Sequence, residues 1–125
     1  MQMKGGYVDG DAEYTLSKVE IRGARGEQMS GVFDLDYRNR DLWDYQIETL
    51  QMWAQIVDGF RCDVASMVPV DFWCEAREAV EKVRPGCIWL AESVFQDHVR
   101  GMRSEGAYCA SDSDLYEAFD ICYPY

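Results

Sequence analysis

The feature that most constrains the fold is an alternation of helical and strand patterns across residues 41–92. Apolar residues recur every three or four positions from Trp43 onward, which predicts an amphipathic helix. Asn39 or Asp41 is suited to begin this helix, and we expect it to end near Ile56. A helix of this kind needs a partner surface on which to bury its apolar side.

Two strands and a second helix continue the alternation. Residues 57–65 form a short mixed run that fits a strand with polar residues at its carboxyl end. Helical spacing returns from Phe72, with Asp71 placed to cap, and Pro85-Gly86 ends this helix. Residues 87–91, CIWLA, are then an unbroken apolar run of strand length. Such a strand is typical of a parallel sheet covered on both faces, so the pattern predicts an α/β fold.

The flanks of this core are less regular. Residues 1–31 are rich in glycine and charge, with a weak alternation over residues 14–21 that predicts loop with one strand or hairpin. Residues 96–104 have the pattern of a short helix. Residues 114–117 have capping-box character before another short helix, and residues 119–123 fit a third strand.

Charge and cysteine usage exclude several classes of function. With 23 acidic and 12 basic residues, the net charge of −11 would repel a phosphate backbone, so we expect no nucleic-acid partner. No apolar run approaches the roughly 20 residues that a membrane helix needs, and the first residues lack the pattern of a secretory signal. Five widely spaced cysteines without a CxxC pair, and a single histidine, favour reduced core thiols over a disulfide framework or a zinc site. We therefore expect a cytoplasmic protein without membrane contact.

Two carboxylates stand at the carboxyl ends of the two predicted strands. Asp63 lies late in one strand and Glu92 directly follows the next, so a right-handed βαβ unit would bring both to one edge of the sheet. Barrels of the α/β type build active sites at this edge, and retaining glycosidases use two carboxyl groups about 5–5.5 Å apart. Arg61 points to the same strand face as Asp63 and would keep it ionised. Apolar neighbours, Trp89 and Phe95, would let Glu92 retain its proton.

Spacing alone leaves other interpretations open. Among 23 acidic residues some pair will meet at a sheet edge by chance. Arg61 and Asp63 are also suited to a structural ion pair, and Glu92 to capping the turn that follows it. A third interpretation uses Asp58, Asp63 and Glu92 as magnesium ligands in phosphoryl chemistry, although the sequence has no glycine-rich phosphate loop.

Several stretches, in order along the chain, resemble motifs of one enzyme family. Residues 58–65, DGFRCDVA, are similar to the fourth-strand motif of the α-amylase family, glycoside hydrolase family 13. Residues 89–93, WLAES, resemble its fifth-strand motif. Residues 34–37 and 70–73 resemble the end of the family's domain B and the start of its fourth barrel helix, and residues 115–120 resemble the approach to its sixth strand.

The resemblance implies an α/β fold that is part of a TIM (β/α)₈ barrel. Residues 34–125 would hold roughly the third helix to the sixth strand, and residues 1–33 would be a loop-rich remnant of domain B. A complete barrel needs about 200 residues or more, so we expect an incomplete fragment. Unpaired strand edges at both ends of such a fragment predict self-association.

The resemblance also implies a function and its residues. The family acts on α-glucosidic linkages by a retaining mechanism, with hydrolysis or transglycosylation, so the implied substrate is an α-glucan or maltooligosaccharide. Asp63 matches the nucleophile, Glu92 the acid/base, and Arg61 the neighbour that orients and charges Asp63. Phe95 and Ser93 beside Glu92 are the expected substrate contacts. No cofactor is required for this chemistry.

A structural calcium ion joins domain B to the barrel in many members of the family. Asp34 and the carbonyl of Met67 match two of its ligand positions, but calcium prefers six to eight oxygens. Ser66-Met67 replaces the Lys-His pair often seen there, which leaves glucan specificity open. The alternative to an enzyme is a non-catalytic glucan-binding or structural fragment. Three tryptophans at helical spacing are expected in the core, namely Trp43, Trp53 and Trp73.

Overall fold

The computed structural model describes residues 4–9, 12–15 and 35–124. The chain divides into two compact units, Met1–Asp36 and Tyr37–Tyr125. In the first unit, strand β1 (Lys4–Asp9) pairs antiparallel with β2 (Ala12–Thr15) as a hairpin. Most of the alternation at residues 14–21 lies outside the described residues. The assignment of residues 1–33 to domain B stays a prediction.

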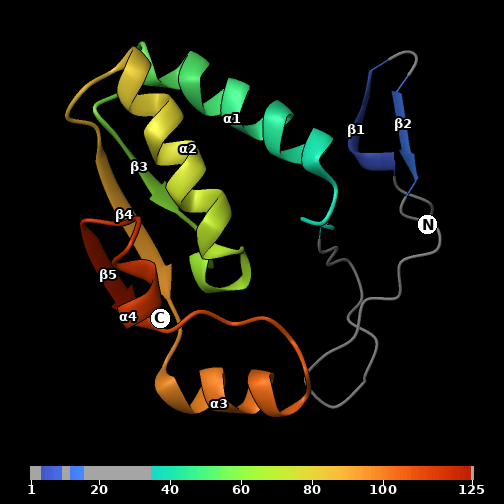
Figure 1. The fold of residues 1–125 in the computed structure, drawn as a ribbon, viewed down its shortest axis with the longest axis vertical. Coiled ribbons are helices and arrows are strands. Elements are labelled where there is room, and N and C mark those ends of the chain that lie inside the picture. The colour runs from blue at the N-terminus through green and yellow to red at the C-terminus, as the bar shows by residue number, and fades with distance from the viewer. Residues whose placement is uncertain (1–3, 10–11, 16–34, 125) are drawn as a thin grey trace. The chain divides into compact units, whose positions relative to one another are not determined.

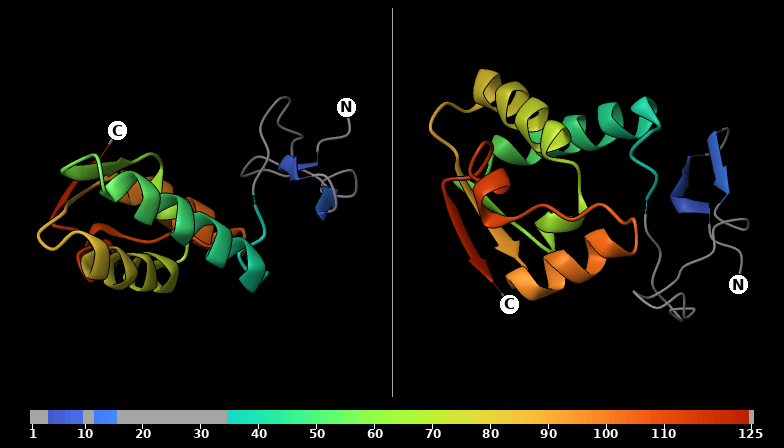
Figure 2. Two further views of the ribbon diagram at one scale, coloured as in Figure 1. Left: turned by 90° about the horizontal axis from the view of Figure 1, so that it is seen from above. Right: turned by 60° about the horizontal axis from the view of Figure 1, so that its bottom comes forward.

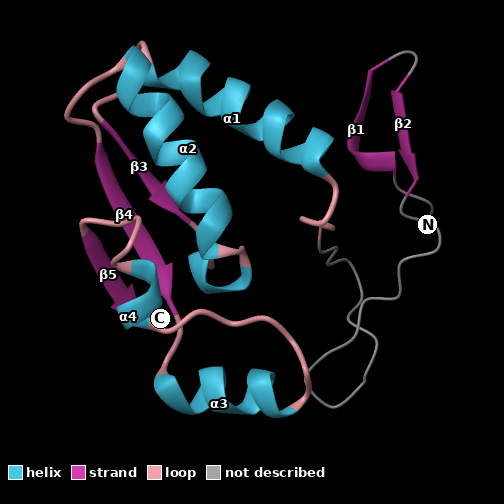
Figure 3. Cartoon of the chain, viewed as in Figure 1, coloured by secondary structure: helices cyan, strands magenta, loops and turns pink. Residues whose placement is uncertain are grey.

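The second unit is a three-stranded parallel sheet with helices between its strands, as Figures 1 and 3 show. Its elements are α1 (Arg40–Ala54), β3 (Gly59–Cys62), the 3₁₀ turn η1 (Ala65–Met67), α2 (Val70–Val83), β4 (Ile88–Ser93), α3 (Gln96–Ser104), α4 (Asp112–Leu115) and β5 (Ile121–Pro124). The strand order is β3-β4-β5, and both pairs are parallel. The predicted α/β fold with a parallel sheet is therefore confirmed. Within the described residues, no helix is long and apolar enough to cross a membrane.

Helix α1 begins as the sequence predicts and packs beside α2 (Figure 2). Asn39 is the N-cap, and its side-chain oxygen accepts the backbone N–H of Asp41 at 3.0 Å. The side-chain amide of Gln51 donates to the carbonyl of Ala79 in α2 at 2.9 Å. This contact links the two helices through a backbone group as well as through apolar packing.

An aromatic cluster fills the space between the helices and the sheet. Phe72 of α2 packs edge-on against Trp43 of α1, with ring centroids 5.5 Å apart, and against Trp73 at 5.2 Å. Trp73 contacts Phe119 just before β5, which in turn contacts Trp89 of β4 at 6.1 Å. Edge-to-face pairs of this kind stabilise a core beyond their buried area. The cluster joins both helices to the central strand.

Three local expectations differ from the structure. Asp71 does not cap α2, because Pro69 occupies the cap position and Asp71 lies inside the first turn. The capping box belongs to α4 and starts at Ser111, with Asp114 as its acidic partner rather than its first residue. Trp53, expected in the core, is 49% exposed because it lies on the outer side of α1.

Gly59 marks a close approach between β3 and β4. A Cβ atom at this position would lie 2.6 Å from the carbonyl oxygen of Ile88, its register partner. We therefore expect Gly59→Ala to lower the free energy of unfolding by about 1–3 kcal/mol in urea titrations. Gly101→Ala in α3 is the control, because its Cβ would meet nothing within 4 Å and should raise stability by up to about 1 kcal/mol. Equal stability of the two variants would contradict the close packing.

Candidate active site

The candidate site lies at the carboxyl ends of the three parallel strands. The register pairs Cys62 with Ala91 and Glu92 with Tyr123. Asp63, one residue beyond Cys62, therefore comes level with Glu92. Side chains alternate along a strand, so Glu92 points away from the sheet face that carries the buried Ala91. The structure thus brings side chains from three strands together at one edge.

Arg61 is the centre of this group. Its Nη1 donates to Oδ1 of Asp63 at 2.5 Å, and its Nη2 lies 3.2 Å from Oε2 of Glu92. Its Nε and Nη2 also donate to the hydroxyl of Tyr123 at 2.9 and 2.8 Å. One guanidinium therefore contacts both predicted carboxylates, which places Asp63 and Glu92 close together, as the βαβ argument predicts.

Val64 completes the site from the backbone. Its N–H donates to Oε2 of Glu92 at 2.9 Å. To do so, Val64 adopts φ 45° and ψ 45°, a left-handed conformation that β-branched residues rarely take. The strained turn after β3 directs a donor at the carboxyl group of the neighbouring strand. Glu92 therefore accepts a hydrogen bond from the turn that follows the neighbouring strand. Helix α3 has no side-chain cap, since its N-cap residue is Phe95.

The two carboxyl groups have different surroundings. The Asp63 side chain is 73% exposed, whereas that of Glu92 is 9% exposed. The pKa of Asp63 is lowered below its ordinary 3.8, first by the hydrogen bond from Arg61 and second by a hydrogen bond with Glu92. The pKa of Arg61 is raised by its hydrogen bonds to Tyr123 and Asp63, so the cation persists at every working pH. Asp63 is therefore held in the ionised form that a nucleophile needs.

The lowered pKa of Asp63 predicts a measurable titration. In carboxyl-carbon NMR, the Asp63 midpoint should lie below 3.8 and should rise toward 3.8 in Arg61→Gln. Since the pKa of the folded state is the lower one, the ion pair stabilises the fold above about pH 3.8 and loses this effect as the pH falls through the folded midpoint. Arg100→Gln, which removes an exposed pair with Asp97, should leave the Asp63 midpoint unchanged. An equal midpoint in wild type and Arg61→Gln would contradict the assigned cause.

Comparison with solved structures identifies the family. A crystal structure of an α-amylase from Lactobacillus plantarum is 46% identical over 85% of this chain, with a TM-score of 0.73. The chain belongs to the α-amylase family. It covers 26% of the length of that structure, and its sheet and helices match part of the α-amylase barrel. No family model matches the chain, and no curated protein is significantly similar to it.

Two further α-amylase structures match a similar part of the chain. One, from Anoxybacillus, is 24% identical over 82% of this chain and 21% of its own, with a TM-score of 0.57, and supports the fold alone. The other, from Geobacillus thermoleovorans in complex with acarbose, is 26% identical over the same shares, with a TM-score of 0.55. The chain therefore spans between 21% and 26% of the length of these α-amylases.

The two expected substrate contacts occupy different positions. Phe95 is 63% exposed just beyond β4 and lines a cavity of about 200 Å³ with Pro124 at the end of β5. Ser93, in contrast, is 0% exposed. Alternation along β4 turns Ser93 to the opposite face from Glu92, so the expectation that it touches substrate does not fit this structure. Phe95 remains a candidate contact.

The described residues do not make a metal site. Met67 ends the η1 turn, and Asp34 lies outside the described residues. In the part of the chain that is described, no group of three or more acidic, cysteine or histidine side chains is arranged to hold a metal ion. Asp58 forms an ion pair with Arg84 at the end of β3 opposite to Asp63, so the magnesium interpretation loses one of its ligands. The magnesium interpretation therefore loses support, and the calcium ligands Asp34 and Met67 stay a prediction.

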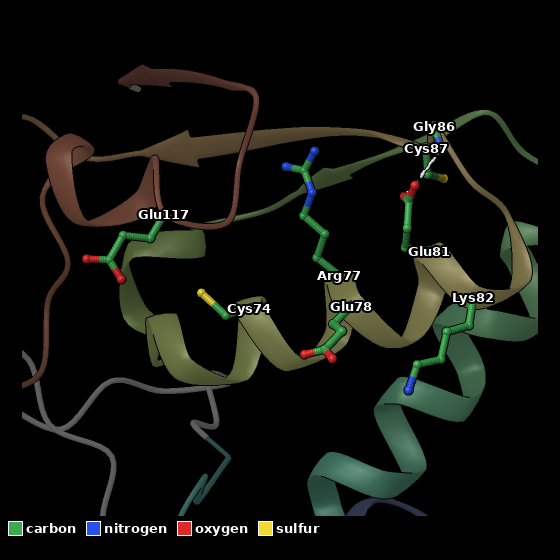
Figure 4. A pocket seen from close by; sticks show the side chains of 8 residues that line it. All are labelled: Cys74, Arg77, Glu78, Glu81, Lys82, Gly86, Cys87 and Glu117. Carbon is green, nitrogen blue, oxygen red and sulfur yellow. Dashed lines mark hydrogen bonds between the residues drawn. The ribbon is translucent and has the colours of Figure 1, made fainter.

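An open groove of about 570 Å³ lies away from the candidate site, and Figure 4 shows the residues that line it. It runs along α2 and reaches Cys87, directly before β4, whereas Glu92 lies near the other end of this strand.

All five cysteines are unpaired thiols, and burial raises the pKa of Cys62, beside Asp63, to about 12. Cys62 is therefore no rival nucleophile.

Tyr123 is the site residue that sequence reasoning missed. The sequence predicts a strand over residues 119–123 but assigns no role to the tyrosine at its end. Its register partner is Glu92, so extending the parallel register from the second predicted strand to the third would have found it.

Proposed function

We propose that the chain carries the nucleophile and the acid/base of a retaining α-amylase-type enzyme, which hydrolyses or transfers at α-glucosidic linkages. The observation that carries the proposal is the guanidinium of Arg61 in contact with both Asp63 and Glu92 at one sheet edge. Membership of the α-amylase family supports it. The acarbose bound by the Geobacillus thermoleovorans α-amylase supports a carbohydrate substrate, here an α-glucan or maltooligosaccharide.

The proposed reaction is a double displacement. Asp63, exposed and held ionised by Arg61, attacks the anomeric carbon and forms a β-glycosyl-enzyme. Glu92 donates its proton to the departing glycosidic oxygen as that bond breaks. Glu92 then takes a proton from water, or from a sugar hydroxyl in transfer, as this oxygen attacks the anomeric carbon and releases Asp63. Two inversions leave the product with the α configuration of the substrate.

The geometry also suits two separate carboxyl roles. Burial shields the carboxyl group of Glu92 from water, and exposure leaves the carboxylate of Asp63 accessible to a sugar ring. The exposed ring of Phe95, next to this edge, offers a face for a pyranose ring. A calcium ion between domain B and the barrel remains a proposal for a form of the protein that supplies further oxygen ligands.

Product stereochemistry tests the proposed mechanism. The purified chain is incubated with maltotriose, and proton NMR follows the anomeric signal of the first product before mutarotation. The proposal predicts α-anomer formed first, with no release from Asp63→Asn. A β-anomer formed first would replace double displacement with single inversion.

A second candidate is a non-catalytic glucan-binding or structural fragment. It agrees with membership of the α-amylase family and does not require that the chain, which spans 21–26% of the α-amylases compared above, completes the reaction. It predicts no release of p-nitrophenol from p-nitrophenyl α-glucoside by the wild type, by Asp63→Asn or by Glu92→Gln. Binding of maltooligosaccharide by calorimetry without turnover would then separate a binding role from a structural one.

A further inference from the structure

Tyr123 contacts the cation at the centre of the site. Its hydroxyl accepts hydrogen bonds from Nε and Nη2 of Arg61 at 2.9 and 2.8 Å. The Cζ atom of Arg61 also lies 5.9 Å from the centroid of the Tyr123 ring. The two residues are far apart in sequence and meet because β5 joins the sheet beside β4. Tyr123 is also the largest cause of the raised pKa of Arg61.

The hydroxyl of Tyr123 occupies the part of Arg61 that best binds carboxylates. Nε and Nη2 form one edge of the guanidinium, and such an edge commonly binds both oxygens of a carboxyl group. With this edge on Tyr123, Nη1 is directed to Asp63, and Glu92 keeps one longer contact of 3.2 Å from Nη2. Because Nη2 already lies 3.2 Å from Oε2 of Glu92, loss of the hydroxyl would leave this edge free to pair with that buried carboxyl group.

We propose that Tyr123 is a positioning residue that fixes Arg61 on Asp63 and prevents its Nε–Nη2 edge from closing on Glu92. A two-bond pair with Arg61 would hold Glu92 as a carboxylate and remove the proton donor of the first step. The inference rests on the proposed function and adds a residue to it. Tyr123 acts through Arg61 and does not touch the reacting atoms.

The Nε–H signal of Arg61 tests this contact without catalysis. In ¹⁵N-labelled wild type, its hydrogen exchange should be slower than that of the exposed Arg100 by about ten-fold or more. Tyr123→Phe should remove this protection. Glu92→Gln should shift the Arg61 Nε–H signal more in Tyr123→Phe than in the wild type, because in the wild type only Nη2 contacts Glu92 and in the variant Nε contacts it as well. The inference is overturned if Tyr123→Phe leaves the signal unchanged.

Tyr108→Phe is the matched control. It removes a hydroxyl that accepts the N–H of Val70 at 2.9 Å, outside the Arg61 cluster, and should not alter the Arg61 signal. Circular dichroism checks that each variant folds. If Tyr123→Phe does not fold, the wild-type signal decides, since exchange of the Arg61 Nε–H as fast as that of Arg100 would show that the Tyr123 hydroxyl does not hold it and would overturn the inference.

Leaving-group dependence provides the catalytic readout. Tyr123→Phe should lower kcat on maltotriose by about ten-fold, and on p-nitrophenyl α-glucoside by less than about three-fold, with little change in KM. The p-nitrophenol leaving group departs with little help from a proton, so turnover of p-nitrophenyl α-glucoside depends little on the proton that Glu92 donates. Equal losses on both substrates would overturn the inference. Absence of turnover in wild type, with the Nε–H results as predicted, would reject the proposed function and support the positioning of Arg61.

Discussion

Replacing Asp63 with asparagine is expected to lower kcat on maltooligosaccharides by about 10⁴-fold or more in the purified chain. The amide is nearly the same shape as the carboxylate but cannot form the glycosyl-enzyme bond. Asp63 is 73% exposed, so the substitution should not disturb packing. Initial rates measured by reducing-sugar release, beside thermal unfolding of both proteins, separate chemistry from stability.

Asp58→Asn is the matched control for this prediction. Asp58 lies at the opposite end of the same strand and pairs with Arg84 on the surface, with its side chain 88% exposed. The same change of charge there should alter kcat by less than about two-fold. Comparable losses in Asp58→Asn and Asp63→Asn would mean that net charge, and not nucleophilic attack, explains the effect.

Truncating Trp89 to alanine is expected to lower the free energy of unfolding by about 3–5 kcal/mol. Trp89 is 1% exposed in the central strand and contacts Phe60 and Phe119, with ring centroids 5.1 and 6.1 Å away. Its removal would leave a cavity beside Phe60 and Phe119. Urea unfolding followed by circular dichroism measures the loss.

Trp53→Ala provides the control, because the same side chain is removed from a surface position of α1 that is 49% exposed. Its expected cost is about 1 kcal/mol or less. Trp89→Phe should cost less than Trp89→Ala, since an aromatic ring still fills most of the space and, among the described residues, the buried Nε1 of Trp89 has no hydrogen-bond partner to lose. Similar losses for both alanine variants would contradict the central position of Trp89.

Periodicity predicted the elements that position the site. The helical spacing that starts at Trp43 and the apolar run at residues 87–91 both signal burial, and burial is a property of each segment by itself. The meeting of Asp63 and Glu92 followed from the handedness of one βαβ unit. These local rules were sufficient to place both carboxylates at one edge.

Other features depend on contacts between distant segments. Tyr123 meets Arg61 only because β5 pairs with β4 in a particular register, which no local pattern encodes. The left-handed backbone of Val64 opposes the ordinary preference of valine and is maintained by its surroundings. The burial of Ser93 depends on which face of β4 the helices cover, and the sequence motif carries no information on that choice.

The most direct test of the account is covalent trapping of the nucleophile. The purified chain is incubated with 5-fluoro-α-glucosyl fluoride, which forms a slowly released glycosyl-enzyme, and tryptic peptides are analysed by mass spectrometry. The account predicts a fluoroglucosyl adduct on Asp63, absent in Asp63→Asn and present in Asp58→Asn. An adduct on another carboxylate, or none on Asp63 under conditions in which the chain turns over substrate, would contradict it.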